Sequence, residues 1–300
     1  MNGRLDEGRL QITVPAGASM KCPQCGQDVS PHSFTCPVCQ QPLGFPNVRA
    51  ASEQPERDAL GQRYSDTRNR AQSRGADDQI TRFEQAMSES QAVIAQREQS
   101  LVLLFDKDCG LFKTFYRQLD DGEREPLDNG FDQQRQGVDA TYFPHYFKEI
   151  HFAALSLNGC GLESYGEWHL TLRTPTIAHR SSVFEENTLV FTQKHGVNPV
   201  DGPPAGYRAA WDARQRLAVA KLGDAIDGTT APRDYPGILM KQTGQTDQDD
   251  FIEVHIYGTL DERCIESFRL PRKPKNKEAR VEWLRLKRRL EKAGATERTN

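Results

Sequence analysis

Apolar residues recur at helical spacing in one long segment of the chain. Behind Asp77 and Asp78, large apolar side chains follow one another at three-, four- and seven-residue intervals, which predicts an amphipathic helix over roughly residues 78–105. The stripe consists of Ile80, Phe83, Met87, Ile94 and Leu101. A helix that buries one face shows this repeat, so we interpret the stripe as core packing or a coiled contact.

The pattern changes after Pro144, where short apolar runs follow one another at close spacing. They cover residues 150–157, 168–172, 182–184, 189–191, 238–240 and 251–257. Such runs between turn residues predict a β-rich domain over 141–270. Inside it, residues 205–226 combine many alanines and arginines with five apolar residues, which predicts one helix inserted between strands: Tyr207, Trp211, Leu217, Leu222 and Ile226.

More polar segments lie outside these regions. Residues 45–76 predict a polar linker or a solvated helix, because large apolar groups are few. Residues 106–140 give weak signals with Gly and Pro at loop positions, so 77–140 as a whole is assigned as a helical segment. Residues 10–14 alternate and predict a short strand. Residues 277–292 predict a final amphipathic helix with Val281, Leu284 and Leu290 on one side.

Composition and charge set limits on the partners. A chain of 300 residues is expected to form two or three compact units, and 36% apolar against 27% charged residues leaves part of it solvated. The net charge of −3 does not require a nucleic-acid or membrane partner. No apolar run is long enough to cross a bilayer, and the first ten residues lack the features of a signal peptide. We therefore expect a cytoplasmic protein with no membrane contact.

Four of the seven cysteines form two Cys-x-x-Cys knuckles, at Cys22 and Cys25 and at Cys36 and Cys39. Four thiolates fill the tetrahedral shell that zinc prefers and leave no open position for catalysis. Residues 22–39 resemble the zinc-ribbon family, and we predict a structural Zn²⁺ at these four residues. A segment this short and polar seldom folds without a metal. Zinc ribbons bind nucleic acid, bind proteins or brace a neighbouring domain, and the local charge does not choose among these roles.

Several polar residues interrupt the β-rich domain. Tyr165-Gly166 opens one predicted strand, and Arg180-Ser181-Ser182 opens another that we expect beside it. In residues 251–257 the alternation places Glu253 and His255 on one face of a strand and the aliphatic residues on the other. The sequence therefore predicts a carboxylate and an imidazole side by side.

These segments resemble a group of bacterial toxin-like proteins related to ADP-ribosyltransferases. In that group a Tyr-Gly strand precedes an Arg-Ser or Arg-Thr strand, and a strand of the type Glu-x-x-Ile/Val-x-Gly follows much later. The same order runs from residue 165 to residue 258 here. The resemblance implies a bacterial effector or defence protein that uses NAD as co-substrate.

The resemblance also implies roles for single residues. Glu253 would be catalytic, because a carboxylate stabilises the positive charge that develops on the ribose carbon as nicotinamide departs. Arg180 would contact the NAD phosphates. Ser181 or Ser182 would hold the strand or the nicotinamide ribose, and Tyr165 would stack on the nicotinamide ring. His151 is a candidate for the histidine of the family's first strand.

A cluster of basic residues suggests a different function. Between Arg269 and Lys292 the chain carries eleven Lys or Arg residues against three Glu residues. Such an excess fits contact with a phosphate backbone or an acidic partner, although a solvated helix face has the same composition. The alternative hypothesis is therefore a non-catalytic adaptor that binds nucleic acid or protein through the ribbon or the basic tail.

The predicted fold class is α+β. The expected segments are a zinc ribbon over 1–44, a polar linker or solvated helix over 45–76, a helical segment over 77–140, a mixed, β-rich ADP-ribosyltransferase-like domain over 141–270, and a basic helix and tail over 271–300. The leading hypothesis is an ADP-ribosyltransferase-like protein whose ribbon recruits a target.

Overall fold

The computed structural model describes residues 20–30, 33–106, 110–122 and 130–299. The chain divides into two compact units, Met1–Pro46 and Asn47–Asn300. The predicted strand at 10–14 lies outside the described residues. The fold is α+β, as predicted, with a four-cysteine cluster near the N-terminus and a large mixed sheet in the second unit.

The first unit is built around a short hairpin and two knuckles. Strands β1 (Met20–Lys21) and β2 (Asp28–Val29) pair antiparallel, with Met20 opposite Val29. Its small core consists of Cys22, Val29, Cys36 and Leu43, with Met20 and Cys39 packed against them. So few buried apolar groups supply little folding free energy to this unit.

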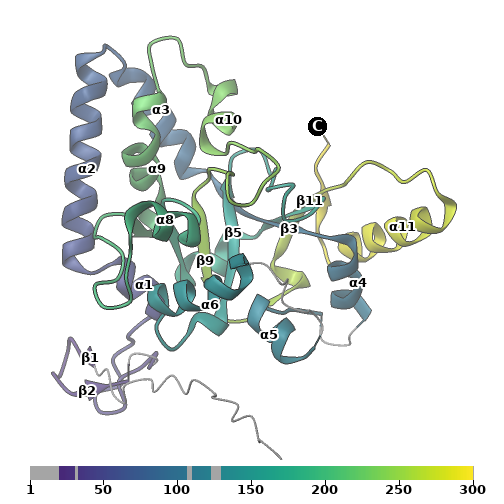
Figure 1. The fold of residues 1–300 in the computed structure, drawn as a ribbon, viewed down its shortest axis with the longest axis horizontal. Helices are drawn as coiled ribbons and strands as arrows, with labels where there is room; N and C mark the ends of the chain where they lie inside the picture. Colours follow the sequence, from purple (N-terminus) through teal and green to yellow (C-terminus); the bar gives the residue numbers. More distant parts are fainter. Residues whose placement is uncertain (1–19, 31–32, 107–109, 123–129, 300) are drawn as a thin grey trace, which may run out of the picture. The chain divides into compact units, whose positions relative to one another are not determined.

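The second unit contains the remaining helices and strands (Figure 1). Its helices are α1 (Pro46–Ala51), α2 (Gln54–Ser73), α3 (Asp77–Ser88), α4 (Glu98–Asp106), α5 (Phe115–Asp120), α6 (Gly130–Tyr142), α7 (Thr174–Ile177), α8 (Thr188–His195), α9 (Arg214–Leu222), α10 (Tyr235–Leu239) and α11 (Lys277–Lys292). Its strands are β3 (Gln91–Gln96), β4 (Leu111–Phe112), β5 (Ile150–Ser156), β6 (Trp168–Leu172), β7 (Ser181–Phe184), β8 (Arg208–Ala210), β9 (Glu253–Tyr257), β10 (Leu260–Asp261), β11 (Ile265–Arg269) and β12 (Thr296–Glu297).

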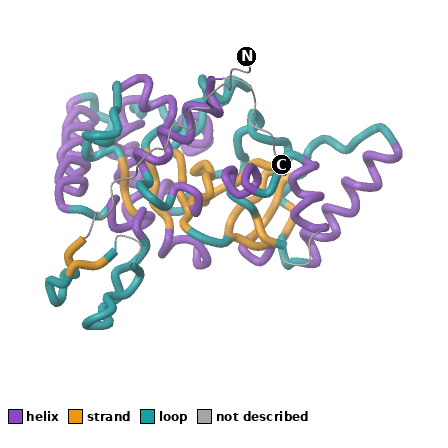
Figure 2. Tube along the Cα trace, turned by 60° about the horizontal axis from the view of Figure 1, so that its bottom comes forward, coloured by secondary structure: helices purple, strands orange, loops and turns teal. Residues whose placement is uncertain are grey.

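One sheet organises the second unit. Among the described residues it has eight strands in the order β12-β11-β6-β3-β5-β9-β7-β8, while β4 and β10 form a separate pair. Neighbouring strands run antiparallel, except that β11 and β12 are parallel. Figure 2 shows the strands of this unit lying between groups of helices. The central strands are therefore covered on both faces, and their side chains are buried throughout β6 and β7.

The register around β9 fixes which residues share a face. His255 lies opposite Phe152 of β5 and Ser182 of β7, and Glu253 lies opposite Ala154 and Phe184. Residues directly opposite each other project to the same side of a sheet. We call this side the site face.

The two faces pack against different helices. On the face opposite the site face, Val183, Val254 and Ile256 join the main core. That core takes Ile80, Phe83 and Met87 from α3 and Leu217, Ala218 and Leu222 from α9. A second cluster on the site face consists of Tyr142, Phe143, Tyr146, Ile150, Phe184 and Phe191. Helices α6 and α8 thus bring aromatic side chains over the strand that carries Glu253.

The predicted helix over 78–105 is wrong in its middle. It divides into α3 and α4, with strand β3 between them. Ala92, Val93 and Ile94 are all buried in β3, because this central strand is covered on both faces. A continuous apolar run of this kind fits a helix stripe as well as a buried strand. Since β3 lies between β5 and β6, the predicted helical segment and β-rich domain belong to one unit.

Other local predictions have mixed outcomes. The strands expected at 150–157, 168–172, 182–184 and 251–257 are present as β5, β6, β7 and β9. Residues 189–191 lie in α8 and 238–240 lie largely in α10, so those two strand predictions are wrong, and the helix expected over 205–226 is β8 followed by α9. Helix α11 has the predicted bounds, but it buries Trp283, Leu286 and Leu290 and leaves Val281 62% exposed.

Candidate functional site

The four knuckle cysteines come together in the first unit. One ligand atom from each of Cys22, Cys25, Cys36 and Cys39 lies within 4.8 Å of all the others. The Sγ atoms of Cys22 and Cys39 are 3.5 Å apart, and those of Cys25 and Cys36 are 3.7 Å apart. The cluster has the size and the donor atoms of a metal centre, as predicted.

The two knuckles share one backbone arrangement. The N–H of Gly26 donates to the carbonyl of Cys22, and the N–H of Gln40 donates to the carbonyl of Cys36. Gly26 and Gln40 both have positive φ, 71° and 61°, which is the conformation that closes each turn. The backbone N–H of Cys39 also stabilises the thiolate of Cys36 and lowers the pKa of that thiol to about 6. The backbone of the second knuckle therefore favours the thiolate, the form that binds a metal, at Cys36.

In the second unit, Glu253 and His255 form a buried pair on β9. Oε2 of Glu253 lies 2.9 Å from Nε2 of His255, and both side chains are 3% exposed. The same oxygen accepts a hydrogen bond from the backbone N–H of Thr188 at the start of α8, at 3.3 Å. Phe143 and Phe152 pack edge-on to the imidazole. The alternation predicted from the sequence thus places a carboxylate against an imidazole, away from solvent.

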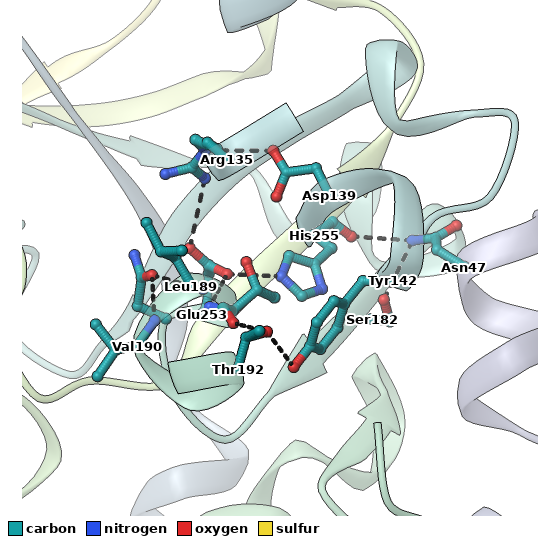
Figure 3. A network of polar contacts seen from close by, with 12 residues as sticks. Asn47, Arg135, Asp139, Tyr142, Ser182, Leu189, Val190, Thr192, Glu253 and His255 are labelled. Carbon is teal, nitrogen blue, oxygen red and sulfur yellow. Dashed lines mark hydrogen bonds and ion pairs between the residues drawn. The ribbon is translucent and has the colours of Figure 1, made fainter. Parts of the chain in front are cut away.

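Helix α6 supplies a guanidinium to this pair. Nη2 of Arg135 lies 4.0 Å from Oε1 of Glu253, while its Nε donates to Oδ2 of Asp139 at 3.2 Å (Figure 3). Tyr116 also donates to Oδ2 of Asp139, at 2.6 Å. Burial lowers the pKa of Arg135, but the carboxylates of Asp139 and Glu253 outweigh it and raise the pKa, so this side chain stays charged. The result is a buried network in which one guanidinium lies between two carboxyl groups, and burial raises the pKa of the Asp139 carboxyl.

Tyr165 reaches the network from the loop before β6. Its hydroxyl accepts a hydrogen bond from Nδ2 of Asn187 at 3.2 Å. Asn187 caps α8, because its Oδ1 accepts from the N–H groups of Leu189 and Val190. Burial raises the pKa of Tyr165 to about 12, so its hydroxyl remains protonated at neutral pH. Tyr165 and Glu253 therefore contact the same helix end.

A narrow pocket adjoins His255 on the site face. It is lined by Asn47, Ala50, Tyr142, Phe143, Tyr146, Ser182, Phe184, Arg208 and His255. Nδ2 of Asn47 donates to Oγ of Ser182 at 3.3 Å and to the carbonyl of His255 at 3.0 Å. Figure 3 shows the imidazole of His255 between the carboxylate of Glu253 and the ring of Tyr142. Oδ1 of Asn47 is buried and has no hydrogen-bond partner among the described residues. Asn47 thus retains an unused acceptor.

The structure does not bring Arg180 to Glu253. Nη1 of Arg180 donates to the carbonyl of Tyr257 at 2.6 Å and its Nε donates to the carbonyl of Thr176 at 3.0 Å. Arg180 thus lies at the far end of β9 and braces the backbone there. Its role as a phosphate ligand stays a prediction, and the guanidinium beside Glu253 belongs to Arg135.

The remaining predicted residues divide between the two faces. Ser182 lies opposite His255 on the site face. Ser181 lies opposite Ile256 on the other face, where its hydroxyl donates to the carbonyl of Ile177 at 2.8 Å. His151 is also paired with Ile256, so it does not share a face with Glu253. The strands that follow Tyr165 and Arg180, β6 and β7, were expected to be adjacent, but β3, β5 and β9 lie between them.

Close backbone packing explains why residue 166 is a glycine. A Cβ atom at this position would lie 2.2 Å from the backbone carbon of Gln96. Only glycine permits so close an approach of two backbone segments. The glycine of the Tyr-Gly motif is thus explained by packing of the loop against the end of β3.

Sequence reasoning did not find Arg135, Asp139, Asn47 or Asn187. Arg135 and Asp139 are four residues apart on a polar helix, which in sequence is the spacing of an ordinary surface ion pair. Their burial depends on how α6 packs over β9, and no local pattern reports that. Asn187 did carry a signal, since Asn before a helix is a preferred N-cap, but the helix after it was taken for a strand.

None of the helices in the described part of the chain combines the length and the apolar character that a membrane crossing requires. Comparison of the chain with protein-family models gives no match, and comparison with curated proteins gives none either.

Proposed function

We propose that the second unit transfers ADP-ribose from NAD to an acceptor, with Glu253 as the catalytic carboxylate, and that the first unit is a zinc ribbon that directs the protein to its target. The observation that carries the enzymatic part is the position of Glu253. Its carboxylate is buried on a central strand and is held by groups from three elements: His255 of β9, the Thr188 N–H of α8 and Arg135 of α6.

The chemistry requires such a carboxylate. The bond between the ribose C1′ and the nicotinamide nitrogen breaks, neutral nicotinamide leaves, and an acceptor atom bonds to C1′ as it gives up a proton. Positive charge develops on the ribose before the new bond is complete. His255 lies on the same strand as Glu253, so it can keep the carboxylate oriented toward this charge when helices move. Tyr165, which contacts the same end of α8 as Glu253, is the aromatic ring proposed to stack on nicotinamide.

The proposal has a structural requirement. Because Glu253 is 2% exposed, NAD reaches it only if α6 and α8 separate from β9. The ion pair between Arg135 and Glu253 then opens, and the guanidinium becomes available to a phosphate. A contact between Arg180 and the NAD phosphates stays a prediction; in this conformation its Nε and Nη1 donate to backbone carbonyls.

The test uses the full-length protein with labelled NAD and cell extract. We expect label transfer or nicotinamide release by the wild type, and its loss in Glu253→Gln, which keeps the shape of the side chain and removes its charge. The matched control is Glu163→Gln, because Glu163 is exposed in the loop before β6. Thermal unfolding of each variant separates loss of chemistry from loss of fold. No turnover by the folded wild type, or equal turnover by folded Glu253→Gln, refutes the proposal.

The zinc part rests on the donor set. Four sulfur donors in two Cys-x-x-Cys turns match the closed tetrahedral shell of structural zinc. Cys22, Cys25, Cys36 and Cys39 would hold the ion, and the ion would supply folding free energy rather than a reactive position.

A second candidate is the non-catalytic adaptor, which one observation favours. Helix α11 carries several basic side chains on its exposed side, beside an apolar groove. Salt-sensitive binding of a partner by a protein that does not consume NAD would support this candidate over the enzyme.

A further inference from the structure

Helices α4 and α11 pack side by side and enclose a groove in the second unit (Figure 1). Its volume is about 460 Å³, and its floor includes Val102 and Phe105 of α4 and Leu286 of α11. The charged part of the lining is mostly basic: Arg285, Arg288, Arg289 and Lys292, with Glu282 as its one acidic residue. The groove therefore combines an apolar floor with positive charge along one side.

The groove exposes apolar surface that the core of the protein does not use. Helix α11 is anchored by Trp283, Leu286 and Leu290, which are buried. Val281 also lines the groove but is 62% exposed. On α4, Leu103 is 45% exposed. Both helices thus present aliphatic side chains to solvent after their own packing is complete.

The positive charge of the lining is only partly balanced. Arg285 pairs with Glu282 at 3.3 Å, and Arg289 pairs with Glu262 at 3.4 Å. Arg288 and Lys292 have no ion-pair partner in the described part of the chain. They are four residues apart on α11, where like charges repel and destabilise a helix. An anionic group between them would remove this repulsion.

The apolar and basic groups lie on one stripe of α11. Val281, Arg285, Arg288 and Lys292 are spaced by four, three and four residues, so they follow one side of the helix. A partner that runs along the groove would meet an aliphatic contact at one end and cations toward the other. A helix packs between two neighbouring helices when its side-chain ridges fit their grooves. An amphipathic helix would place its apolar side chains on the floor and its charged side chains beside the basic residues.

We propose that the α4–α11 groove binds an acidic amphipathic helix of a partner protein. The aliphatic residues of that helix contact the floor, and its Asp or Glu residues lie against Arg288 and Lys292. Single-stranded nucleic acid fits less well, because its bases stack on open aromatic faces. The aromatic residue of the lining, Phe105, is 9% exposed and lies near the guanidinium of Arg289. This inference does not depend on the proposed NAD chemistry.

The test measures binding of a defined probe to the full-length protein. The probe is a fluorescent, hydrocarbon-stapled helical peptide with Leu at every third or fourth position and Glu on the flanking positions. A control peptide of the same composition distributes its Leu residues around the helix. A short DNA duplex and a single-stranded oligonucleotide are measured under the same salt conditions. We expect saturable binding of the first peptide only.

Variants locate the site. Reversing both unpaired cations, Arg288→Glu with Lys292→Glu, is expected to weaken binding at least about ten-fold, and Val281→Asp by a similar factor. The matched control is Arg272→Glu with Lys273→Glu, which makes the same charge change at two exposed residues of the loop before α11 and should leave affinity unchanged. All four positions changed to Glu are on the surface or partly exposed, and thermal unfolding confirms that each variant is folded.

Three results would overturn the proposal. One is the absence of saturable peptide binding by the folded wild type. Another is equal affinity for the control peptide, or equal loss in both charge-reversal pairs, since either means general attraction between opposite charges. The third is tighter binding of an oligonucleotide that Arg288→Glu with Lys292→Glu abolishes, because it identifies a phosphate-binding surface instead.

Discussion

His151 is expected to make the second unit sensitive to mild acid. Its side chain lies in β5, and the residue is 7% exposed. Burial, together with the positive charges of Arg180 and Arg117, lowers the pKa of His151 to about 3 from its ordinary value of 6.5. The unfolded chain therefore binds a proton at this residue as the pH falls below 6.5, while the folded protein does not. The neutral, buried His151 therefore costs no stability above pH 6.5. Below pH 6.5 the unfolding free energy decreases, because protonation favours the unfolded chain.

The size of the effect at pH 5 follows from these two values. A group that titrates at 6.5 when unfolded and well below 5 when folded removes about 2 kcal/mol of unfolding free energy between neutral pH and pH 5. This figure depends little on the folded pKa as long as that pKa is below about 4. With a urea m-value of about 2 to 3 kcal/mol per molar, the unfolding midpoint moves by nearly 1 M.

The assay is urea unfolding at several pH values, followed by tryptophan fluorescence. All three tryptophans, Trp168, Trp211 and Trp283, lie in the second unit, so the signal reports this unit rather than the cysteine cluster. The stability of His151→Gln should fall about 2 kcal/mol less than that of the wild type between pH 7.5 and pH 5. The difference between the two profiles isolates His151 even if the substitution changes stability at neutral pH.

A control and a refuting result complete this prediction. His195→Gln, which replaces a solvent-exposed imidazole of α8, is the control for removing a histidine from the second unit. Parallel profiles for His151→Gln and the wild type would show that the burial argument is wrong. So would an imidazole signal of His151 that titrates near pH 6.5 in the native protein.

Three further outcomes are expected. Elemental analysis should find one equivalent of zinc that Cys25→Ser or a strong chelator removes, while the tryptophan-reported transition of the second unit stays unchanged. Arg135→Met should lower the unfolding free energy by about 3 to 5 kcal/mol in urea titrations, because Asp139 is left buried without its cation. Gly166→Ala should cost about 1 to 3 kcal/mol through the clash with Gln96, whereas Gly61→Ala, in open space on α2, should stabilise by about 1 kcal/mol.

The sequence predicted correctly those features that depend on the spacing of residues close together in the chain. The cysteine spacing predicted the metal-binding cluster, and the apolar repeat of residues 277–292 predicted α11. Alternation along β9 placed Glu253 and His255 together, because the period of a strand is a local property. These features depend on few contacts with distant residues.

The remaining features depend on which distant segments meet. Strand β3 was taken for helix because its central position buries both of its faces, which removes the alternation of a half-exposed strand. Arg135 contacts Glu253 only because α6 lies over the site face. Arg180 was assigned to the site from its order in a motif, and the sheet order instead places it at the other end of β9. Order along the chain does not determine proximity in a sheet with crossovers.

The strand order has a consequence for synthesis of the protein. Strand β3 pairs with β5 and β6, and β5 in turn pairs with β9, which begins only at Glu253. A growing chain therefore carries the apolar residues of β3 long before their partners leave the ribosome, and the centre of the sheet closes only when most of the polypeptide is complete. Pairing between such distant segments is slow and leaves strand edges open to wrong partners.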